Sequence, residues 1–250
     1  MDVRRFYVAP HEFKGERVRI SGEEAHHLRR VLRLGPGDEV DVFDGAGHEY
    51  RVELRYFHGD AVWGYVLEET TVPREAPIFV SLAQGLAKGE KMELVIQKAT
   101  EIGVASVIPL HTARSVPRPG SGQARREERW QRIAREAAKQ CWRTVVPAVE
   151  PLCTLPELVR RFSEYQAVLF FWEEEKSRHL HEVLATLKAQ GHIQRLLLIV
   201  GPEGGFSPEE AQLVAENGAV SVTLGPRILR TETAGLVAAS IILYELGDLG

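Results

Sequence analysis

The chain has 250 residues, of which 44% are apolar and 26% charged, a composition typical of globular domains. This length suits one or two domains, and the absence of any apolar run of roughly 18 residues predicts that the chain has no membrane partner. A net charge of −4 gives no overall attraction for nucleic acid. The opening residues lead into no apolar signal segment, so we expect a cytoplasmic protein. Two cysteines provide neither a disulfide framework nor a zinc site.

The first 72 residues alternate short apolar and polar segments with turns, which is typical of a small β-barrel. Ser21-Gly22-Glu23-Glu24 matches a capping box and predicts a helix over 25–34. The stretch 68–77 contains two prolines and few apolar residues, which predicts a linker, and we place a domain boundary between residues 72 and 73. The strands expected before it are 4–8, 17–20, 39–43, 49–57 and 61–67.

Beyond the linker, strands alternate with helices, which predicts a parallel α/β domain over 73–250. Continuous apolar runs at 167–172 and 196–200 indicate strands that are buried on both faces. Ser207-Pro208-Glu209-Glu210 has the residues of a helix start. Further strands are expected at 78–83, 106–111, 145–149 and 220–224, and helices at 88–102, 124–141, after Thr154 and at 232–246.

Positive charge is concentrated in one segment. Residues 114–143 contain nine arginine or lysine residues against three glutamates. On the helix expected at 124–141, Trp130 and Ala134 belong to an apolar stripe that leaves the arginines outward. Two interpretations stay open at this point. The arginines form either a solvated helix face with Arg–Glu pairs or a set of phosphate contacts for a nucleic acid.

Two segments that each join a strand to a helix contain candidate functional residues. The glycines of Gly201-Pro202-Glu203-Gly204-Gly205 let the backbone approach a ligand, although a tight turn explains them equally well. The second segment is 224–234, and we expect both at one edge of the sheet, where parallel strands end. Arg230 and Glu232 lie there between a buried strand and an apolar helix, but Glu232 also complements the helix dipole.

Other candidate sites do not match a known pattern. The segment 85–91 lacks the spacing of a phosphate-binding P-loop, and the glycine loop is not a dinucleotide fingerprint. The histidines have no cysteine or carboxylate cluster at metal-ligand spacing, so we expect no metal.

Three segments together resemble the bacterial 16S rRNA (uracil-N3)-methyltransferase family of the SPOUT superfamily. They are the Gly201–Gly205 loop, the Leu-Gly-x-Arg-Ile-Leu-Arg-Thr-Glu-Thr-Ala sequence of 224–234, and 126–147 with its Arg129-Trp130 and Val146-Pro147 pairs. The opening of the chain, with Arg5-Phe6-Tyr7-Val8, also looks like that family's opening. The likeness covers nearly the whole chain.

The resemblance implies an α/β protein with a PUA-like RNA-binding β-barrel at 1–72 and a SPOUT methyltransferase domain at 73–250, whose chain forms a trefoil knot. It further implies a homodimer that uses S-adenosyl-L-methionine. The implied reaction is methylation of N3 of a uridine in 16S rRNA, with the assembled small ribosomal subunit as the preferred substrate.

The resemblance also places the functional residues. Methyl transfer to N3 requires loss of the N3 proton and stabilisation of the negative charge on the uracil carbonyls, which makes Arg230 and Glu232 the catalytic candidates. The cofactor pocket would consist of Phe171, Trp172, Val200, Gly201, Pro202, Glu203, Gly204, Gly205, Leu224, Gly225, Ile228, Leu229, Arg230, Thr231, Thr233 and Ala234. The RNA contacts would be Arg4, Arg5, Arg29, Arg30, Arg33, Arg114, Arg125, Arg129, Arg132, Lys139 and Arg143.

Two alternatives remain. One is another SPOUT RNA methyltransferase that acts on tRNA or on the ribose 2′-hydroxyl. The other is an RNA-binding protein without catalytic activity, which would use the barrel and the basic helix alone.

Overall fold

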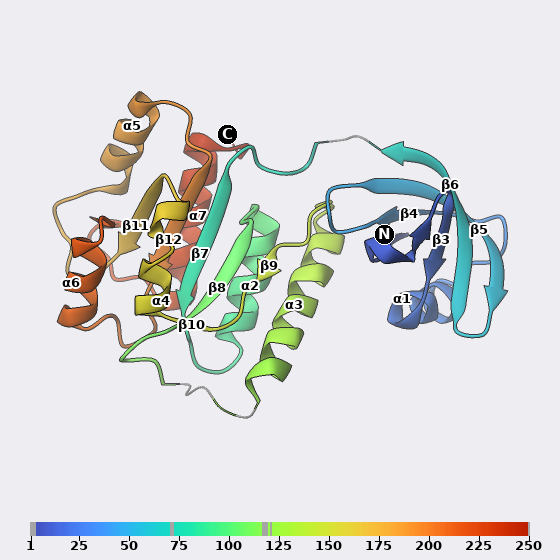
Figure 1. The fold of residues 1–250 in the computed structure, drawn as a ribbon, viewed down its shortest axis with the longest axis horizontal. Coiled ribbons are helices and arrows are strands. Elements are labelled where there is room, and N and C mark those ends of the chain that lie inside the picture. The colour runs from blue at the N-terminus through green and yellow to red at the C-terminus, as the bar shows by residue number, and fades with distance from the viewer. Residues whose placement is uncertain (1–3, 71–72, 117–119, 121, 250) are drawn as a thin grey trace. The chain divides into compact units, whose positions relative to one another are not determined.

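The computed structural model describes residues 4–70, 73–116, 120 and 122–249. Two compact units are present (Figure 1). We call Met1–Glu75 with Arg135–Val146 the N-terminal unit, and Ala76–Ala134 with Pro147–Gly250 the C-terminal unit. The domain boundary between residues 72 and 73 stays a prediction, because residues 71 and 72 lie outside the described part of the chain.

The N-terminal unit is built on a curled sheet with the strand order β1-β4-β5-β6-β3-β2. Neighbouring strands are antiparallel, except that β1 runs parallel to β4. Alternate residues such as Val18, Ile20 and Val62 are fully buried and form the core of this unit. The strands are β1 (Arg5–Tyr7), β2 (Phe13–Lys14), β3 (Arg17–Ile20), β4 (Glu39–Phe43), β5 (Glu49–His58) and β6 (Ala61–Thr70).

Three local predictions in this unit are wrong. The capping box at Ser21 does not form, because the Ser21 hydroxyl lies 3.5 Å from Glu12 Oε1, in the short helix η1 (Pro10–Glu12), and caps no backbone N–H. The helix itself is short, with α1 (Gly22–His26) passing into the π-helical turn η2 (His27–Val31). The first residues of the expected linker are strand, since β6 pairs with β5 as far as Thr70.

The C-terminal unit contains a parallel sheet with the strand order β10-β8-β7-β12-β11-β13, and β9 pairs with β8. The strands are β7 (Phe79–Gly85), β8 (Ser106–His111), β9 (Ala148–Val149), β10 (Cys153–Thr154), β11 (Ala167–Phe171), β12 (Arg195–Val200) and β13 (Val220–Val222). The helices are α2 (Lys91–Ile102), α3 (Gln123–Gln140), α4 (Leu155–Val159), η3 (Phe162–Glu164), α5 (Leu180–Gln190), α6 (Pro208–Glu216) and α7 (Thr231–Leu246).

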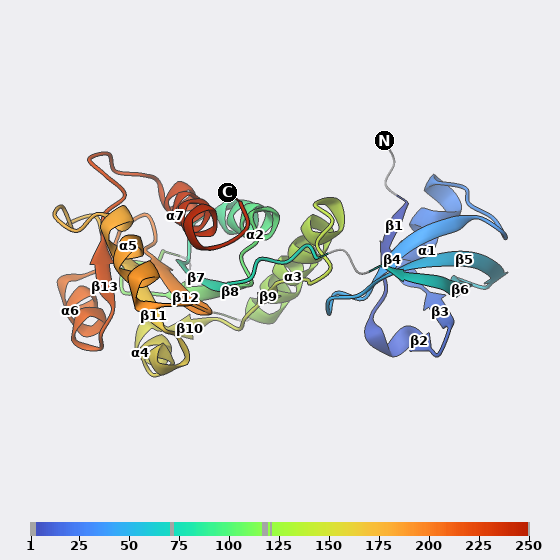
Figure 2. The ribbon, with the colours of Figure 1, turned by 90° about the horizontal axis from the view of Figure 1, so that it is seen from above.

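Helices cover both faces of this sheet. Figure 2 shows α2 and α7 on one face and α4 and α6 on the other. Leu197 and Ile199 of β12 pack toward α4 and α6, while Leu196, Leu198 and Val200 alternate with them and are also buried. The apolar run 196–200 therefore is a strand buried on both faces, as its sequence predicts. The predicted fold class, a parallel α/β domain that follows a small β-rich N-terminal domain, is confirmed.

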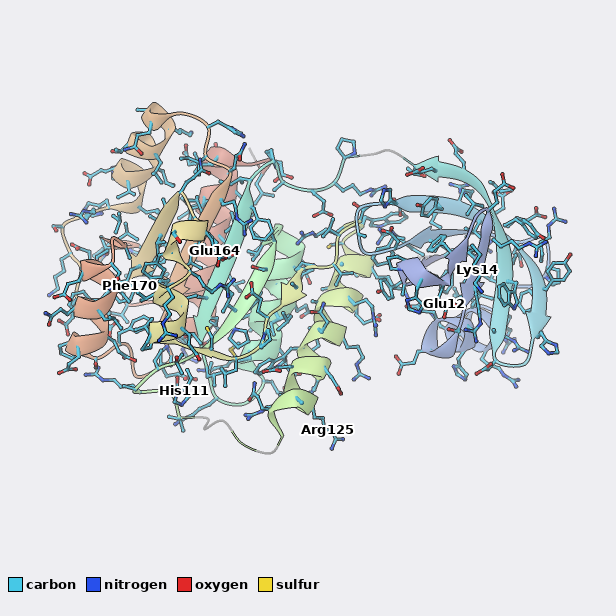
Figure 3. All side chains as sticks on the ribbon, viewed as in Figure 1. Glu12, Lys14, His111, Arg125, Glu164 and Phe170 are labelled. Atoms are coloured by element: carbon cyan, nitrogen blue, oxygen red, sulfur yellow. The ribbon has the colours of Figure 1, made fainter. Side chains whose placement is uncertain are left out.

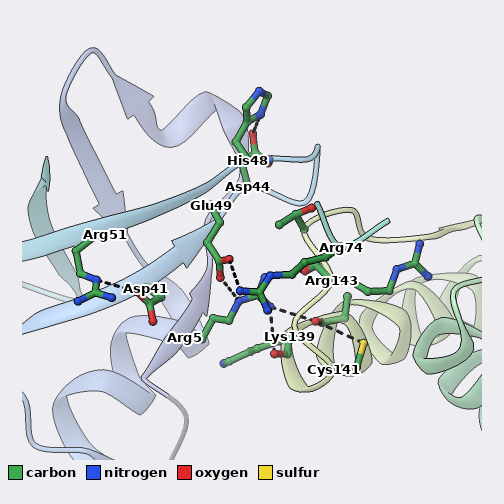
Figure 4. A network of polar contacts seen from close by, with 12 residues as sticks. Arg5, Asp41, Asp44, His48, Glu49, Arg51, Arg74, Lys139, Cys141 and Arg143 are labelled. Carbon is green, nitrogen blue, oxygen red and sulfur yellow. Dashed lines mark hydrogen bonds and ion pairs between the residues drawn. The ribbon is translucent and has the colours of Figure 1, made fainter. Parts of the chain in front are cut away.

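A buried arginine connects the N-terminal sheet to the end of α3 within the N-terminal unit (Figure 4). Arg5 is 0% exposed, and its Nε donates to Glu49 Oε1 at 2.5 Å. Its terminal nitrogens donate to the backbone carbonyls of Ala138 and Lys139, both at 3.1 Å, and of Arg143, at 2.7 Å. The prediction that Arg5 contacts RNA is therefore wrong, because all of its donors face the interior.

Lys139 and Arg143 are corrected for the same reason. Lys139 is paired with Glu24 at 2.7 Å, and its side chain is 13% exposed. The Arg143 side chain is 7% exposed and lies 2.7 Å from Glu75, whose other oxygen accepts from the backbone N–H groups of Thr144 and Val145. These side chains stabilise the N-terminal unit instead of binding phosphate. Across the described residues, no helix combines the length and apolar character that a bilayer crossing requires.

Replacing Arg5 with methionine tests how much this network of hydrogen bonds and ion pairs contributes to the free energy of unfolding. Arg5→Met leaves Glu49 buried beside a weaker partner, Arg74, at 3.5 Å, and removes one donor from each of three carbonyls. We expect the free energy of unfolding to fall by about 3–5 kcal/mol in urea denaturation followed by circular dichroism. Arg51→Met, which removes an exposed pair with Asp41 at 3.0 Å, is the control and should change little. Equal urea midpoints for the two variants would contradict this account.

Candidate functional site

Three loops leave the sheet at the same edge of the C-terminal unit. Phe171, the last residue of β11, is in register with Val200 of β12 and with Val222 of β13. Because these strands are parallel, the loops that begin at residues 172, 201 and 223 start side by side, as predicted for the second and third. These loops contain the residues expected to bind a cofactor.

A buried threonine ties two of the loops together. The Thr231 hydroxyl, at the first position of α7, donates to the Gly201 carbonyl at 2.5 Å, although Gly201 lies 30 residues earlier. Gln84 Nε2, from the end of β7, donates to the same hydroxyl oxygen at 2.8 Å. The chain therefore crosses back over the end of β12 and β7 after it has passed β13 at the sheet edge, in agreement with a knotted topology.

Two glycines make this crossing possible. A Cβ atom on Gly85 would lie 2.3 Å from the Pro202 nitrogen, so the end of β7 accepts no side chain there. A Cβ atom on Gly235 of α7 would lie 3.1 Å from Gln84 Oε1 and 3.2 Å from Leu82. The Gly85 contact is too short for a Cβ atom and the Gly235 contacts are tight for one, so the absence of both side chains lets loop 201–206 and α7 lie directly against β7.

A lysine at the start of α2 connects the two carboxylates of the site. Lys91 Nζ lies 3.0 Å from Glu203 Oε1 and 3.2 Å from Glu232 Oε2. The hydrogen bond to Glu203 raises the pKa of Lys91. Partial burial opposes ionisation of Glu203, but the hydrogen bonds from the Lys88 N–H and from Lys91 outweigh it and lower the pKa of Glu203. Lys91 is therefore the counter-ion of both carboxylates.

Arg230 and Glu232 have different surroundings although they lie two residues apart. Arg230 occupies the N-cap position of α7 with 81% of its side chain exposed, and its nearest carboxylate oxygen is Glu232 Oε1 at 4.0 Å. Glu232 is 14% exposed and lies against Lys91. The guanidinium of Arg230 is thus free to reach a ligand, whereas the Glu232 carboxylate is held in place by an ion pair.

The glycine loop is held by its neighbours on two sides. Gly205 has φ of +67°, and a Cβ atom there would lie 1.9 Å from Glu173 Oε1. Arg114, which was expected to bind RNA, donates to the Gly204 carbonyl at 3.1 Å. A side chain at Gly205 would be both strained and in collision with Glu173, which explains the glycine.

The segment 224–230 presents groups that suit a ligand with an apolar face and a polar edge. Gly225 has φ of +106°, with open space where a Cβ atom would lie. The Ile228 side chain is 88% exposed. Among the described residues, the backbone N–H groups of Ile228 and Leu229 find no hydrogen-bond acceptor, so they are available to a ligand.

The remaining cofactor candidates divide by exposure. Phe171, Val200, Pro202 and Gly205 are buried, and Thr233 is exposed on the first turn of α7. Trp172 stacks on Phe170 with ring centroids 6.2 Å apart. The others, Leu224, Leu229 and Ala234, are half-buried.

Three residues of this site were missed by the sequence analysis, namely Gln84, Lys91 and Glu173. Gln84 and Lys91 follow from the position of β7 beside β12, and this neighbourhood is set by the strand order. The available signal was a glutamine within an otherwise apolar strand and a lysine soon after its carboxyl end.

The remaining basic residues expected to contact RNA are mostly exposed. Arg125, Arg129 and Arg132 lie on the outer side of α3, where Figure 3 shows Arg125 pointing away from the sheet, and Arg129 pairs with Glu93 at 2.7 Å. In the N-terminal unit Arg4, Arg30 and Arg33 are exposed, and Arg29 donates to the Gly59 carbonyl. Within the described part of the chain, no three histidine, cysteine or carboxylate side chains are grouped to hold a metal.

Comparison with protein families identifies relatives along most of the chain. Residues 74–243 match the model of an RNA methyltransferase domain, and residues 20–56 match that of an RNA methyltransferase PUA domain. The chain is 39% identical over 228 residues to the ribosomal RNA small subunit methyltransferase E of Bacillus subtilis, a match that covers 90% of this chain and 89% of the relative.

Solved structures resemble the fold over its full length. A putative methyltransferase from Legionella pneumophila in complex with its cofactor SAM is 31% identical, with a TM-score of 0.88 and complete coverage of both chains. A ribosomal RNA small subunit methyltransferase E from Neisseria gonorrhoeae, bound to S-adenosyl methionine, is 31% identical with a TM-score of 0.87. The match covers 99% of this chain and 100% of that one.

The threonine that ties the loops can be tested by removing its hydroxyl. Thr231→Val leaves the part-buried Gly201 carbonyl with only the longer contact from Gln84 Nε2, at 3.5 Å, so we expect the free energy of unfolding to fall by about 1–3 kcal/mol. Thr231→Ser should restore most of the loss, and Thr233→Val, which removes an exposed hydroxyl two residues away, should have little effect. Urea denaturation of the three variants measures this. A Thr231→Val protein as stable as the Thr233→Val protein would show that the contact is not stabilising.

Proposed function

Since the chain belongs to the RNA methyltransferase family, we propose that it transfers a methyl group from S-adenosyl-L-methionine to N3 of a uridine in 16S rRNA of the small ribosomal subunit. The family and the names of its relatives support methylation of small-subunit rRNA. The single observation that carries the proposed chemistry is the exposed Arg230 at the crossing of loops 201–206 and 224–230.

The residues of the three loops fit the proposed cofactor. The free N–H groups of Ile228 and Leu229 suit the polar edge of adenine, and the open space at Gly225 accepts a ring. When bound, the cofactor supplies an electrophilic methyl group on a positively charged sulfur. The contact between Thr231 and Gly201 fixes the separation of the two loops that would enclose it.

Methylation at N3 replaces an N–H bond by an N–CH3 bond. The N3 proton leaves to a base, the nitrogen lone pair forms the bond to carbon, and the electron pair of the broken carbon–sulfur bond stays on sulfur. Loss of the proton places negative charge on the two uracil carbonyl oxygens beside N3. We assign Arg230 to these oxygens, because its guanidinium is exposed, positively charged and not engaged in a close ion pair.

Glu232 is the proposed proton acceptor, and its two carboxylate oxygens have different surroundings. Its carboxylate is mostly buried, and Oε2 lies at ion-pair distance from Lys91 without a hydrogen bond. Oε1 lies 4.0 Å from Arg230 Nη1, on the side where the uracil would be held. Lys91 orients the carboxylate, so the proton would pass to Oε1 from the substrate or through a water molecule.

The RNA would be held by exposed arginines that carry no sequence information. The outer face of α3 presents Arg125, Arg129 and Arg132, and Arg114 lies beside the glycine loop. Arginines in such positions neutralise phosphates and orient the substrate, while the target uracil must turn out of its stack to reach the site. An rRNA substrate also implies that the protein works in the cytoplasm.

We also propose that the protein is a homodimer, with α7 in the interface. Tyr244 is 62% exposed and Ile241 37% exposed on this otherwise apolar helix, and Leu94 of the neighbouring α2 is 43% exposed. These side chains would be covered by a second copy. Light scattering should give twice the monomer mass of 28.0 kDa, and Tyr244→Glu should shift it toward the monomer. A monomeric wild-type protein at micromolar concentration would refute the dimer.

The assigned reaction is tested with small subunits from cells that lack the mark. Arg230→Ala should lower kcat by roughly 10²–10³-fold because charge stabilisation is lost, while the dissociation constant of S-adenosyl-L-methionine in calorimetry changes only a few-fold. Arg227→Ala, another exposed arginine of the same loop, is the matched control and should retain most activity. Wild-type kcat in Arg230→Ala would remove Arg230 from the mechanism.

Analysis of the modified nucleosides separates the alternatives. Our proposal requires 3-methyluridine in small-subunit RNA. A methyl group on ribose, or in tRNA, would instead indicate another RNA methyltransferase activity. Absence of cofactor binding together with intact RNA binding would indicate an RNA-binding protein without catalysis.

A further inference from the structure

A groove on the outer face of the N-terminal sheet lies among residues that the mechanism does not use. It has a volume of about 540 Å³ and is lined by Lys14, Glu16, Arg17, Trp63 and Tyr65. All five belong to the N-terminal unit and to strands β2, β3 and β6 or the turn between β2 and β3. Figure 3 shows where Lys14 lies on this unit.

The pairing of the strands places the lining side chains in one row. Lys14 is opposite Arg17, and Arg17 is opposite Tyr65 on the next strand. Arg19 is opposite Trp63 in the same way. Because Val18 and Ile20 are fully buried, the residues that alternate with them must face outward. Cations and aromatic rings therefore meet on the outer face of the sheet.

The two aromatic rings are only half-buried, so each leaves part of its surface open. Gly64 between them faces inward, and a Cβ atom there would lie 2.4 Å from Val52 Cγ1. The strand is therefore pressed against the core at Gly64, and both rings must lie on the opposite side. The guanidinium of Arg17 lies 5.5 Å from the centroid of the Tyr65 ring, a distance at which it can stack.

The basic side chains in and beside the groove differ in whether they have an ion-pair partner. Arg19 pairs with Glu12 at 3.2 Å, which neutralises it. For Lys14 and Arg17, the described residues provide no carboxylate within ion-pair distance. Glu16 lines the groove as well and can accept a hydrogen bond from a base N–H or a ribose hydroxyl.

Two half-buried aromatic rings, two cations without an ion pair among the described residues, and one acceptor match the parts of a nucleotide. A base stacks on an aromatic ring, its phosphate meets the cations, and its hydroxyl or imino group meets the carboxylate. An acidic peptide would meet the cations but would leave both aromatic rings unused. The observations therefore favour RNA over an acidic protein partner.

We propose that Lys14, Arg17, Trp63 and Tyr65 form a binding site for an unpaired nucleotide of single-stranded RNA, separate from the methyl-transfer site. This inference rests on the proposed function, because it takes RNA as the substrate class. The groove would hold a single-stranded part of the substrate by stacking, without selecting its sequence.

The test is the affinity of the full-length protein for a short fluorescent oligouridylate, measured by anisotropy over a series of salt concentrations. Trp63→Leu with Tyr65→Leu should weaken binding roughly tenfold or more, because stacking on both rings is lost. Trp63→Phe with Tyr65→Phe keeps two ring faces and should restore most of the affinity. Leu67→Ala, an exposed position farther along β6, is the control for the strand.

A backbone probe separates stacking from charge. Against an abasic oligonucleotide of the same length, the two leucine substitutions should have no effect. Lys14→Ala with Arg17→Ala should weaken binding of both probes and reduce the slope of log affinity against log salt by about 1.4, or 0.7 for each phosphate contact in a single strand. Arg129→Ala with Arg132→Ala on α3 should also weaken binding of both probes equally, since those arginines would contact phosphates and no bases.

An affinity of the leucine pair for oligouridylate within twofold of wild type would overturn the site. A second result would also overturn the site: polyglutamate displaces the RNA from the wild-type protein, and the leucine pair loses affinity for RNA and for polyglutamate equally. That result would indicate an acidic partner. The proposed function fails separately, because it predicts methyl incorporation and cofactor binding by the wild-type protein, which do not enter these titrations. Unchanged unfolding midpoints of the variants confirm that an affinity loss is not a loss of folding.

Discussion

The hydrogen bond from the Thr231 hydroxyl to the Gly201 carbonyl is the contact on which the site depends. It joins two loops that are far apart in the sequence, and Gln84 from a third segment holds the same hydroxyl. The other donor to the Gly201 carbonyl, Gln84 Nε2, lies at 3.5 Å, so the first turn of α7 supplies the shorter hydrogen bond and stabilises this arrangement of the loops. Gly85 and Gly235 permit that approach because they have no side chains.

The same crossing divides the charges of the site into two groups. Lys91 lies against Glu203 and Glu232 and balances their carboxylates, which keeps negative charge away from the open side of the loops. Arg230, one residue before the tying threonine, remains exposed and without a close partner. A site that must stabilise a negatively charged uracil needs such an uncompensated cation. The ion pairs of Lys91 therefore contribute to the chemistry by leaving Arg230 free.

Periodicity predicted most strands of the fold to within a few residues, since the burial of alternate or consecutive positions is a local property. β3, β4 and β8 have the predicted bounds, and the capping sequence at Ser207 forms as expected. The capping sequence at Ser21 fails because Glu12, from another segment, lies near its hydroxyl. Gln84 and Lys91 were missed for a related reason, since strand order determines which loops become neighbours.

The sequence shows where the arginines are, but only the burial of each side chain shows which of them can contact RNA. Arg5 and Arg17 both occur in short strands of the N-terminal sheet, yet Arg5 donates to one carboxylate and three carbonyls while Arg17 lies on the outer face. The difference follows from side-chain alternation together with the end of α3, which brings the carbonyls of Ala138 and Lys139 to Arg5. The end of α3 therefore binds Arg5, a cation that the sequence pattern assigns to a phosphate of the RNA. The arginines that remain for RNA are therefore those that the fold leaves exposed, such as Arg125 on α3.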